Sequence, residues 1–212
     1  SCSSFRLPSS VPPPLLSTRF KPWDLLPFSY KYAKLRLLKR PVLVHFEVTM
    51  RCNAKCSFCD YWKTPADRKA HELKSFVDAA KHFDPMLVTW TGGEPLLRSD
   101  LEDLVAAVDR ALRTKYTTLI THGAMLSLER ARALWQAGVS QFNISLDYPD
   151  ARHDAARGIP GLTQKIFAVA ERIRAEGMTV RFNTVIKDDN LDDILPLVQA
   201  AERMRVGMNL SV

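Results

Sequence analysis

Length, composition and charge describe one soluble domain and exclude several classes of protein. The chain has 212 residues, of which 46% are hydrophobic and 25% charged, so it can bury a core of ordinary size. Three of its four cysteines lie within eight residues, which argues against a disulfide framework and predicts a reducing, cytoplasmic setting. The net charge of +7 comes from residues 1–40, because the remainder carries 22 basic and 22 acidic residues, and this argues against nucleic acid as a partner.

The first 40 residues read as a basic, Pro-rich N-terminal extension that we expect to be partly disordered. Residues 1–27 predict little regular structure, and their apolar runs are too short for a secretory signal or a membrane span. Residues 28–39 predict a short amphipathic helix. Its apolar stripe consists of Phe28, Tyr32, Leu35 and Leu38, with Lys31, Lys34 and Lys39 elsewhere. This segment, 28–40, either covers one end of the domain, the commoner role for such a helix, or makes a peripheral membrane contact.

From residue 42 onward, six strand-like segments alternate with five helical segments. The predicted strands are 42–49, 86–91, 116–121, 141–146, 179–186 and 206–212. The predicted helices are 72–83, 100–113 with Ser99 as N-cap, 127–136, 162–176 and 191–203. Strict alternation predicts an α/β fold of parallel units with right-handed crossovers. Because the chain stops on a strand and parallel sheets are normally covered on both faces, we expect the core domain, 41–212, to lack its C-terminal part.

The chemically distinctive residues all lie at or after the ends of predicted strands. Parallel β/α proteins place their working residues at the C-terminal ends of the strands and in the loops that follow. The sequence puts there the clustered cysteines, Gly92-Gly93-Glu94-Pro95, Thr121-His122-Gly123, Ser145 with Asp147, and Asn183. We therefore expect one site at this edge of the sheet.

Three cysteines form the densest group of metal ligands in the chain: Cys52, Cys56 and Cys59. Spacings of four and three allow one loop to direct three sulfurs at a single centre, as a metal ion or an iron-sulfur cluster requires. A structural zinc site is the main alternative, but zinc needs a closed set of four ligands, and neither Asp60 nor His71 completes a familiar spacing. The remaining cysteine, Cys2, lies far away in the sequence. The spacing therefore favours a cluster with one iron left open.

The segment after the second predicted strand has two interpretations. Gly92 and Gly93 are either a bare turn or a place where a ligand approaches the backbone, with Glu94 as an acceptor for a cationic amine. His122 on its own is more typical of a polar loop residue than of a ligand. Ser145 and Asp147 either bind a ribose or cap the segment that follows.

Two further groups of residues have interpretations that the sequence leaves open or assigns to packing. His153, Asp154 and Arg157 either contact an anionic substrate or hold their own loop together. The large aromatic residues Trp62, Trp90 and Trp135 are expected to pack in the core.

Two of these motifs together resemble the radical S-adenosylmethionine (radical SAM) superfamily, over about residues 41–212. Its signatures are C-x-x-x-C-x-x-C with an aromatic residue before the last cysteine, here Phe58, and a Gly-Gly-Glu segment after the second strand. The run 144–147, followed by His153 and Arg157, looks closest to one branch of that superfamily. That branch contains the molybdenum-cofactor synthase, SPASM-type peptide-modifying enzymes and a hopanoid-adenosylating enzyme.

The resemblance implies a partial, TIM-like (β/α)6 barrel and a set of cofactor contacts. Cys52, Cys56 and Cys59 would hold a 4Fe-4S cluster whose open iron binds the amino and carboxylate groups of S-adenosyl-L-methionine. The other implied cofactor contacts are Gly92, Gly93 and Glu94 at the amino group, Phe58 by the adenine, and Ser145 at the ribose or carboxylate end. Arg181 and Asn183 match positions that contact cofactor or substrate in related enzymes, whereas His122 departs from the commonest pattern.

The implied activity is reductive cleavage of S-adenosylmethionine to a 5′-deoxyadenosyl radical, which abstracts hydrogen from, or adds to, an unidentified substrate. The implied partners are a small-molecule or peptide substrate and an external one-electron reductant of the flavodoxin or ferredoxin type. No catalytic residue is assigned. Two other classes compete: a zinc-stabilised basic binding module, which would bind zinc instead of iron, and an iron-sulfur electron carrier, which has no use for an amine-binding loop.

Overall fold

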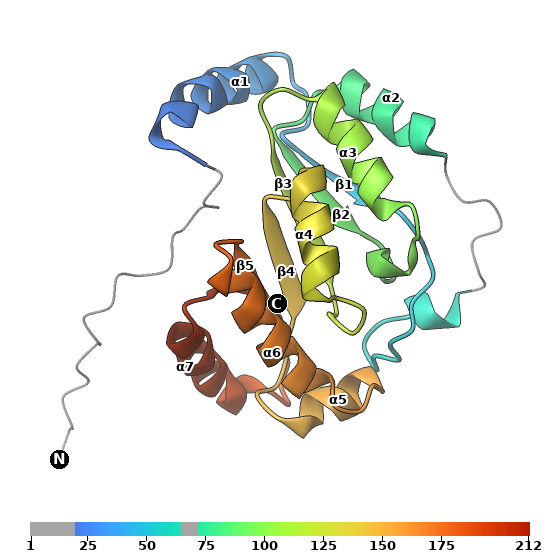
Figure 1. The fold of residues 1–212 in the computed structure, drawn as a ribbon, viewed down its shortest axis with the longest axis vertical. Helices are drawn as coiled ribbons and strands as arrows, with labels where there is room; N and C mark the ends of the chain where they lie inside the picture. Colours follow the sequence, from blue (N-terminus) through green and yellow to red (C-terminus); the bar gives the residue numbers. More distant parts are fainter. Residues whose placement is uncertain (1–19, 65–71) are drawn as a thin grey trace.

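The computed structural model describes residues 20–64 and 72–212, and its centre is one six-stranded parallel sheet (Figure 1). The strands are β1 Leu43–Glu47, β2 Leu87–Thr91, β3 Tyr116–Thr121, β4 Gln141–Ser145, β5 Val180–Val185 and β6 Gly207–Ser211. They pair in chain order from β1 to β6, and every pair is parallel. Within the described ranges β6 does not pair with β1, so the predicted α/β partial barrel of six strands is confirmed.

Helices follow the strands and surround the sheet (Figure 1). The α-helices are α1 Leu25–Leu37, α2 Leu73–Phe83, α3 Leu101–Ala111, α4 Leu128–Ala137, α5 Ala151–Arg157, α6 Leu162–Ala175 and α7 Ile194–Met204. Short 3₁₀ turns are η1 Pro22–Asp24, η2 Tyr61–Lys63, η3 Pro95–Leu97 and η4 Leu191–Asp193. No helix in the described part of the chain is long and apolar enough to cross a membrane.

One face of the sheet is apolar and packs against the helices. Trp90, Leu119, Phe142, Ile144 and Phe182 are fully buried in a continuous core with residues from the helices. Because side chains alternate along a strand, the residues between them point to the opposite, concave face. The apolar face therefore explains why the strand segments are rich in hydrophobic residues. The concave face carries the alternate residues of each strand.

The concave face is lined by polar side chains that bind one another across strands. Thr89 and Thr118 share a hydrogen bond of 3.0 Å between β2 and β3. The Tyr116 hydroxyl donates to Gln141 Oε1 at 2.8 Å, and Asn209 Nδ2 donates to Asn183 Oδ1 at 2.9 Å. The inside of the partial barrel is thus a polar surface instead of a second hydrophobic core.

Four sequence predictions about helices are corrected by the structure. Regular structure begins at Pro22, not after residue 27, because Pro22 and Pro27 both lie in first turns, where a missing N–H costs no hydrogen bond. The N-cap of α3 is Asp100, not Ser99, and its carboxylate accepts from Arg98 Nε at 2.6 Å. Residues 1–19, with Cys2, and residues 65–71, with His71, lie outside the described residues.

The third correction concerns α5, which the sequence interpretation treated as a loop. Asp150 caps this helix by accepting from Arg152 N at 2.9 Å, and Gly158 ends it with φ 66°. His153, Asp154 and Arg157 therefore sit on one short helix that follows β4. Asp154 accepts from the backbone N of Thr163 at 2.7 Å and so ties α5 to the start of α6.

Helix α1 also differs from the prediction in which side chains face the domain. Leu35 and Lys31 are buried, whereas Tyr32 and Leu38, expected on the inner stripe, are 49% and 51% exposed. Lys31 is buried because its ammonium group lies 2.7 Å from the Asp84 carboxylate, which compensates its charge.

Candidate active site

The loops that follow β1 to β4 meet at the C-terminal edge of the sheet, as the sequence predicts. In the described chain the cysteine loop follows β1, Gly92 to Glu94 follow β2, His122 follows β3, and Asp147 with α5 follows β4. Parallel pairing places all these strand ends at the same edge. The candidate site can therefore be described from the contacts between the loops.

The cysteine loop is held in place by two hydrogen bonds of its main chain, one with Arg157 and one with Trp62. Cys52 and Cys59 are partly exposed, Cys56 is buried, and all three are free thiols. Lys55 N donates to the Arg157 carbonyl at 2.8 Å, and the Trp62 indole nitrogen donates to the Cys56 carbonyl at 3.1 Å. Trp62 is 38% exposed, so the expectation that it packs in the core is wrong, and it serves to fix this loop.

The thiols supply the right donor chemistry for an iron-sulfur cluster but are not yet gathered around one point. Within the described residues no three His, Cys, Asp or Glu side chains form a group that could enclose a metal ion. Burial raises the pKa of the Cys52 thiol, and the nearby Glu94 carboxylate raises it further. Because thiolates are the ligands that iron clusters require, a cluster held by these three residues would need them deprotonated and drawn together.

Gly92 and Gly93 bring the second loop into direct backbone contact with the chain that enters the cysteine loop. Gly93 N donates to the Thr49 carbonyl and Glu94 N to the Arg51 carbonyl, both at 2.8 Å. A Cβ on Gly92 would lie 2.4 Å from the Thr49 oxygen, and one on Gly93 would lie 2.2 Å from the Arg51 oxygen. The glycines are therefore required by the fold itself, a reason that the sequence interpretation did not include.

The Glu94 carboxylate is fully buried and is occupied by contacts within the protein. Its Oε1 accepts from Leu96 N at 3.0 Å and from the Thr121 hydroxyl at 2.7 Å, and its Oε2 accepts from His122 N at 2.9 Å. These bonds join the loops after β2 and β3. A contact between the Glu94 residue and an amine of a cofactor stays a prediction.

His122 links the third loop to the cysteine loop. Ala124 N donates to its Nδ1 at 3.2 Å, so Nε2 carries the proton and donates to Asn53 Oδ1 at 2.8 Å. The same Nε2 lies 3.1 Å from Glu94 Oε2. Burial lowers the pKa of His122, which favours the neutral ring that these bonds require. His122 is thus a polar loop residue, as the sequence suggests, and its burial makes it a structural link to the loop that carries Cys52.

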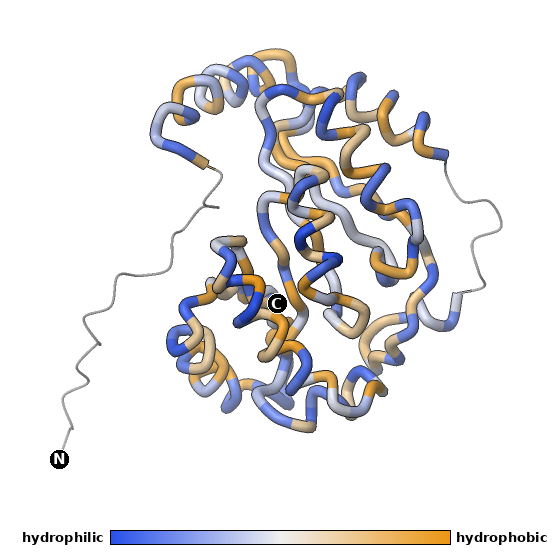
Figure 2. The backbone as a smooth tube through the Cα atoms, in the orientation of Figure 1, coloured by the Kyte–Doolittle hydropathy of each residue, from blue (hydrophilic) through white to orange (hydrophobic). Residues whose placement is uncertain are grey.

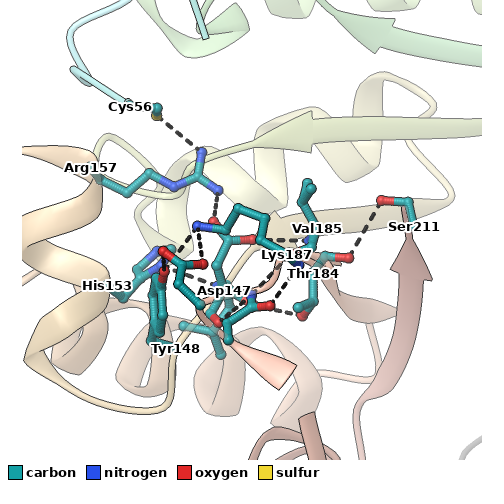
Figure 3. Close-up of polar contacts among 12 residues, drawn as sticks. Cys56, Asp147, Tyr148, His153, Arg157, Thr184, Val185, Lys187 and Ser211 are labelled. Carbon is teal, nitrogen blue, oxygen red and sulfur yellow. Dashed lines mark hydrogen bonds and ion pairs between the residues drawn. The ribbon is translucent and has the colours of Figure 1, made fainter. Parts of the chain in front are cut away.

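Arg157 connects α5 to both the cysteine loop and the end of β4 (Figure 3). Its guanidinium donates to Cys56 Sγ at 3.4 Å and to Asp147 Oδ2 at 2.6 Å. The guanidinium is 9% exposed and the Asp147 carboxylate 0% exposed, so this is a buried ion pair. Asp147 Oδ1 accepts from Val185 N at 3.0 Å, which extends the network to β5. Asp147 and Arg157 therefore hold the site together from within.

Phe58 lies close to two cations of this network. The Arg157 guanidinium carbon is 5.3 Å from the centre of the Phe58 ring, and Lys187 Nζ is 5.1 Å from it. Lys187 also donates to the Tyr148 hydroxyl at 2.9 Å. Phe58 as a residue is 43% exposed, so part of its surface remains available to a ligand.

Ser145 and Asn183 stand side by side on β4 and β5, with their side chains on the concave face. They are register partners, and both are partly exposed. Asn183 Oδ1 is bound by Asn209, whereas Arg181 donates to Gln141 Oε1 at 3.1 Å at the start of β4. Arg181 thus lies deeper in the barrel than Ser145. The cofactor contacts expected for Ser145 and Asn183 stay predictions.

Three comparisons with known proteins bear on this site. A family model described as "Radical SAM superfamily" matches residues 46–201. The "AdoMet-dependent heme synthase" of Nitratidesulfovibrio vulgaris is 30% identical over 168 residues, covering 76% of this chain and 45% of that protein. The "GTP 3′,8-cyclase" of Aquifex aeolicus is 31% identical over 182 residues, covering 81% of this chain and 56% of that protein.

A solved structure has the same fold. The crystal structure of Streptococcus suis SuiB bound to the precursor peptide SuiA aligns with a TM-score of 0.70 at 21% identity, covering 91% of this chain and 45% of that one. At this identity the likeness concerns the fold alone. The chain spans about half the length of the curated relatives it matches.

Proposed function

The chain belongs to the radical SAM superfamily, and from this premise we propose that it is the cofactor-binding core of a radical SAM enzyme. Members of the superfamily use a 4Fe-4S cluster and S-adenosylmethionine. When bound, these groups supply reductive cleavage of the carbon-sulfur bond and a 5′-deoxyadenosyl radical that abstracts hydrogen from, or adds to, a substrate.

One observation carries the proposal: the loop with three free thiols is joined to the Gly-Gly-Glu loop by main-chain hydrogen bonds. Since Gly93 and Glu94 bind the segment just before Cys52, whatever binds to the three sulfurs lies beside the second loop. We propose that Cys52, Cys56 and Cys59 are the cluster ligands.

The remaining residues that we propose to contact S-adenosylmethionine border the same region. They are Phe58, Gly92, Gly93, Glu94, Ser145 and Asn183. The protein's own task would be to bind and orient the cofactor and to exclude water from it, which the buried links through His122 and Arg157 support.

We propose that a small-molecule or peptide substrate binds over the polar concave face, next to Asn183 and Arg181. Support comes from the side chains there, which offer amide and guanidinium groups instead of an apolar core. The relatives' names mention heme synthesis and GTP cyclisation, so the family accommodates different substrates. A flavodoxin- or ferredoxin-type reductant and a cytoplasmic setting complete the proposal, and nucleic acid has no assigned part in it.

Anaerobic reconstitution of the full-length protein with iron and sulfide tests the proposal. We expect about four irons per chain that depend on the three-cysteine motif and, with dithionite and S-adenosylmethionine, release of 5′-deoxyadenosine measured by liquid chromatography. Cys56→Ala should remove these four irons and abolish the release, whereas Cys2→Ala, which alters the cysteine outside the motif, should change neither. Circular dichroism should show the Cys56→Ala protein still folded, because its core lies in the sheet and helices.

Three outcomes would contradict the proposal. Stoichiometric zinc without iron would indicate the zinc-stabilised module. A cluster that cycles without consuming S-adenosylmethionine would indicate an electron carrier. Unfolding of the whole domain in Cys56→Ala would make the cysteines a structural centre.

A further inference from the structure

Helix α1 is attached to the domain through a narrow inner face. Leu35 is 1% exposed, and Lys31 Nζ donates to Asp84 Oδ1 at 2.7 Å and to the Thr114 carbonyl at 2.8 Å. Asp84 precedes β2 and Thr114 precedes β3, so α1 lies at the N-terminal edge of the sheet. This is the edge opposite the candidate active site (Figure 1).

The outer side of α1 carries a second apolar stripe. Leu26, Tyr30 and Leu37 are 79%, 74% and 83% exposed. Their steps of four and seven residues place them on one side of the helix, and Trp23, 72% exposed, extends the stripe through η1. Hydrophobic residues thus recur all along α1 in Figure 2, although only a few of them face the domain. We call Trp23, Leu26, Tyr30 and Leu37 the outer stripe.

The charges around the helical part of the outer stripe are positive, whereas Asp24 lies next to Trp23 at the start of the stripe. No Asp or Glu occurs within Leu25–Leu37, and the exposed residues Lys34 and Arg36 lie to either side of the stripe. Neither of them forms an ion pair within the described ranges. Two aromatic residues with Lys and Arg beside them are typical of helices that lie in the interface of a membrane.

A groove beside the outer stripe adds a place for an anion. It has a volume of about 510 Å³ between α1 and the chain before β3, and its lining includes Tyr30, Lys31, Lys34, Asp84 and Arg113. Asp84 compensates Lys31, whereas Lys34 and Arg113 have no acidic partner in the described part of the chain. The groove therefore presents two uncompensated cations next to an exposed tyrosine.

We propose that α1 docks the protein on an anionic phospholipid surface. The outer stripe would enter the boundary between headgroups and acyl chains, and a lipid phosphate would bind between Lys34 and Arg113. A protein occupant would need acidic groups to match these cations, and a lipid surface provides them at high density. Since α1 lies at the far edge of the sheet, this docking leaves the candidate active site open to the aqueous side.

Vesicle sedimentation of the full-length protein tests the proposal. The probes are vesicles of phosphatidylcholine alone and of phosphatidylcholine with about a quarter phosphatidylglycerol, at low and high salt. We expect the protein to sediment with the anionic vesicles only and to be released by salt. Leu26→Ser with Leu37→Ser, and separately Lys34→Glu with Arg113→Glu, should each weaken the partition by about tenfold or more.

Matched control variants change the same chemistry elsewhere on the surface. Leu191→Ser with Leu195→Ser alters two leucines that are each 58% exposed near α7, and Arg172→Glu with Arg203→Glu reverses two exposed charges. Both controls should bind the anionic vesicles like the natural protein. All four variants should release 5′-deoxyadenosine at the natural rate, which separates this inference from the proposed chemistry.

Three results would overturn the inference. In the first, the natural protein stays in the supernatant with anionic vesicles. In the second, the α1 variants bind these vesicles as tightly as the controls do. If light scattering showed instead that Leu26→Ser with Leu37→Ser changes the oligomeric state without any lipid binding, the outer stripe would be a protein contact.

Discussion

Arg157 is the residue whose replacement should reveal most about how the site is held. Replacing it with Met removes the guanidinium, which is 9% exposed, from the Asp147 carboxylate, which is 0% exposed, while keeping the aliphatic bulk. Breaking a buried ion pair by removing one partner costs about 3–5 kcal/mol, because the other charge is left uncompensated. We expect a loss of this size in the free energy of unfolding of the metal-free protein, measured with urea.

A double variant separates the charge from the contact with sulfur. Asp147→Asn in the Arg157→Met background removes the orphaned carboxylate, so the two changes together should recover about 2 kcal/mol or more of that loss. The hydrogen bond to Cys56 Sγ stays absent in both variants. If Cys56 binds a cluster, its midpoint potential should fall in both, because a cationic donor to the sulfur favours the reduced form.

The matched control is Arg132→Met, on helix α4. The Arg132 side chain is 49% exposed and pairs with Glu176, which is 33% exposed, so its loss should cost at most about 1 kcal/mol. The reasoning would be refuted if Arg157→Met were no more destabilising than Arg132→Met. It would also be refuted if the double variant recovered the midpoint potential along with the stability.

Three other predictions concern separate parts of the site. Gly93→Ala places a Cβ 2.2 Å from a main-chain oxygen, so the variant should lose about 1–3 kcal/mol of unfolding free energy in urea titrations and should also lose iron binding. The control Gly161→Asn adds its side chain in open space and should keep both the stability and the iron. His122→Leu should cost about 1–3 kcal/mol because it removes the buried ring that accepts from Ala124 N and donates to Asn53 Oδ1, and Asn53→Ala should cost less because it removes only the second bond, from an exposed side chain; equal losses would contradict this. Burial, aided by Arg157, lowers the pKa of His153 from 6.5 to about 4, so the unfolded chain binds more protons between these values. The neutral His153 should therefore contribute roughly 3 kcal/mol to the free energy of unfolding above about pH 6.5, and this contribution should be lost as the pH falls toward 4. Urea midpoints measured at pH 7 and pH 5 should differ less for His153→Gln than for the natural protein.

The order of strands and helices could be predicted because each carries its own periodic pattern. The alternation from residue 42 onward led directly to the six parallel strands in chain order. The cysteine loop and the Gly-Gly-Glu segment could be recognised because each is a short, contiguous motif. What these motifs share is that their information lies within a few neighbouring residues.

The contacts between motifs could not be predicted, because they join distant parts of the chain. Arg157 and Cys56 are 101 residues apart, and His122 and Asn53 are 69 apart. The helix α5 was missed although Asp150 and Gly158 mark its two ends, because seven residues are too few for a periodic pattern. The burial of Lys31 likewise depends on Asp84, which no local pattern pairs with it.

The tight seam between the Gly-Gly-Glu loop and the cysteine loop has a consequence for protein engineering. Because the seam consists of main-chain bonds closed over two glycines, few side chains outside it are needed to keep the two loops in register. The polar residues of the concave face, by contrast, meet through their side chains. A library that randomises the concave face apart from Ser145 and Asn183, and leaves positions 92 and 93 fixed, should therefore yield many folded, cluster-competent variants, so that substrate range can be evolved without rebuilding the centre.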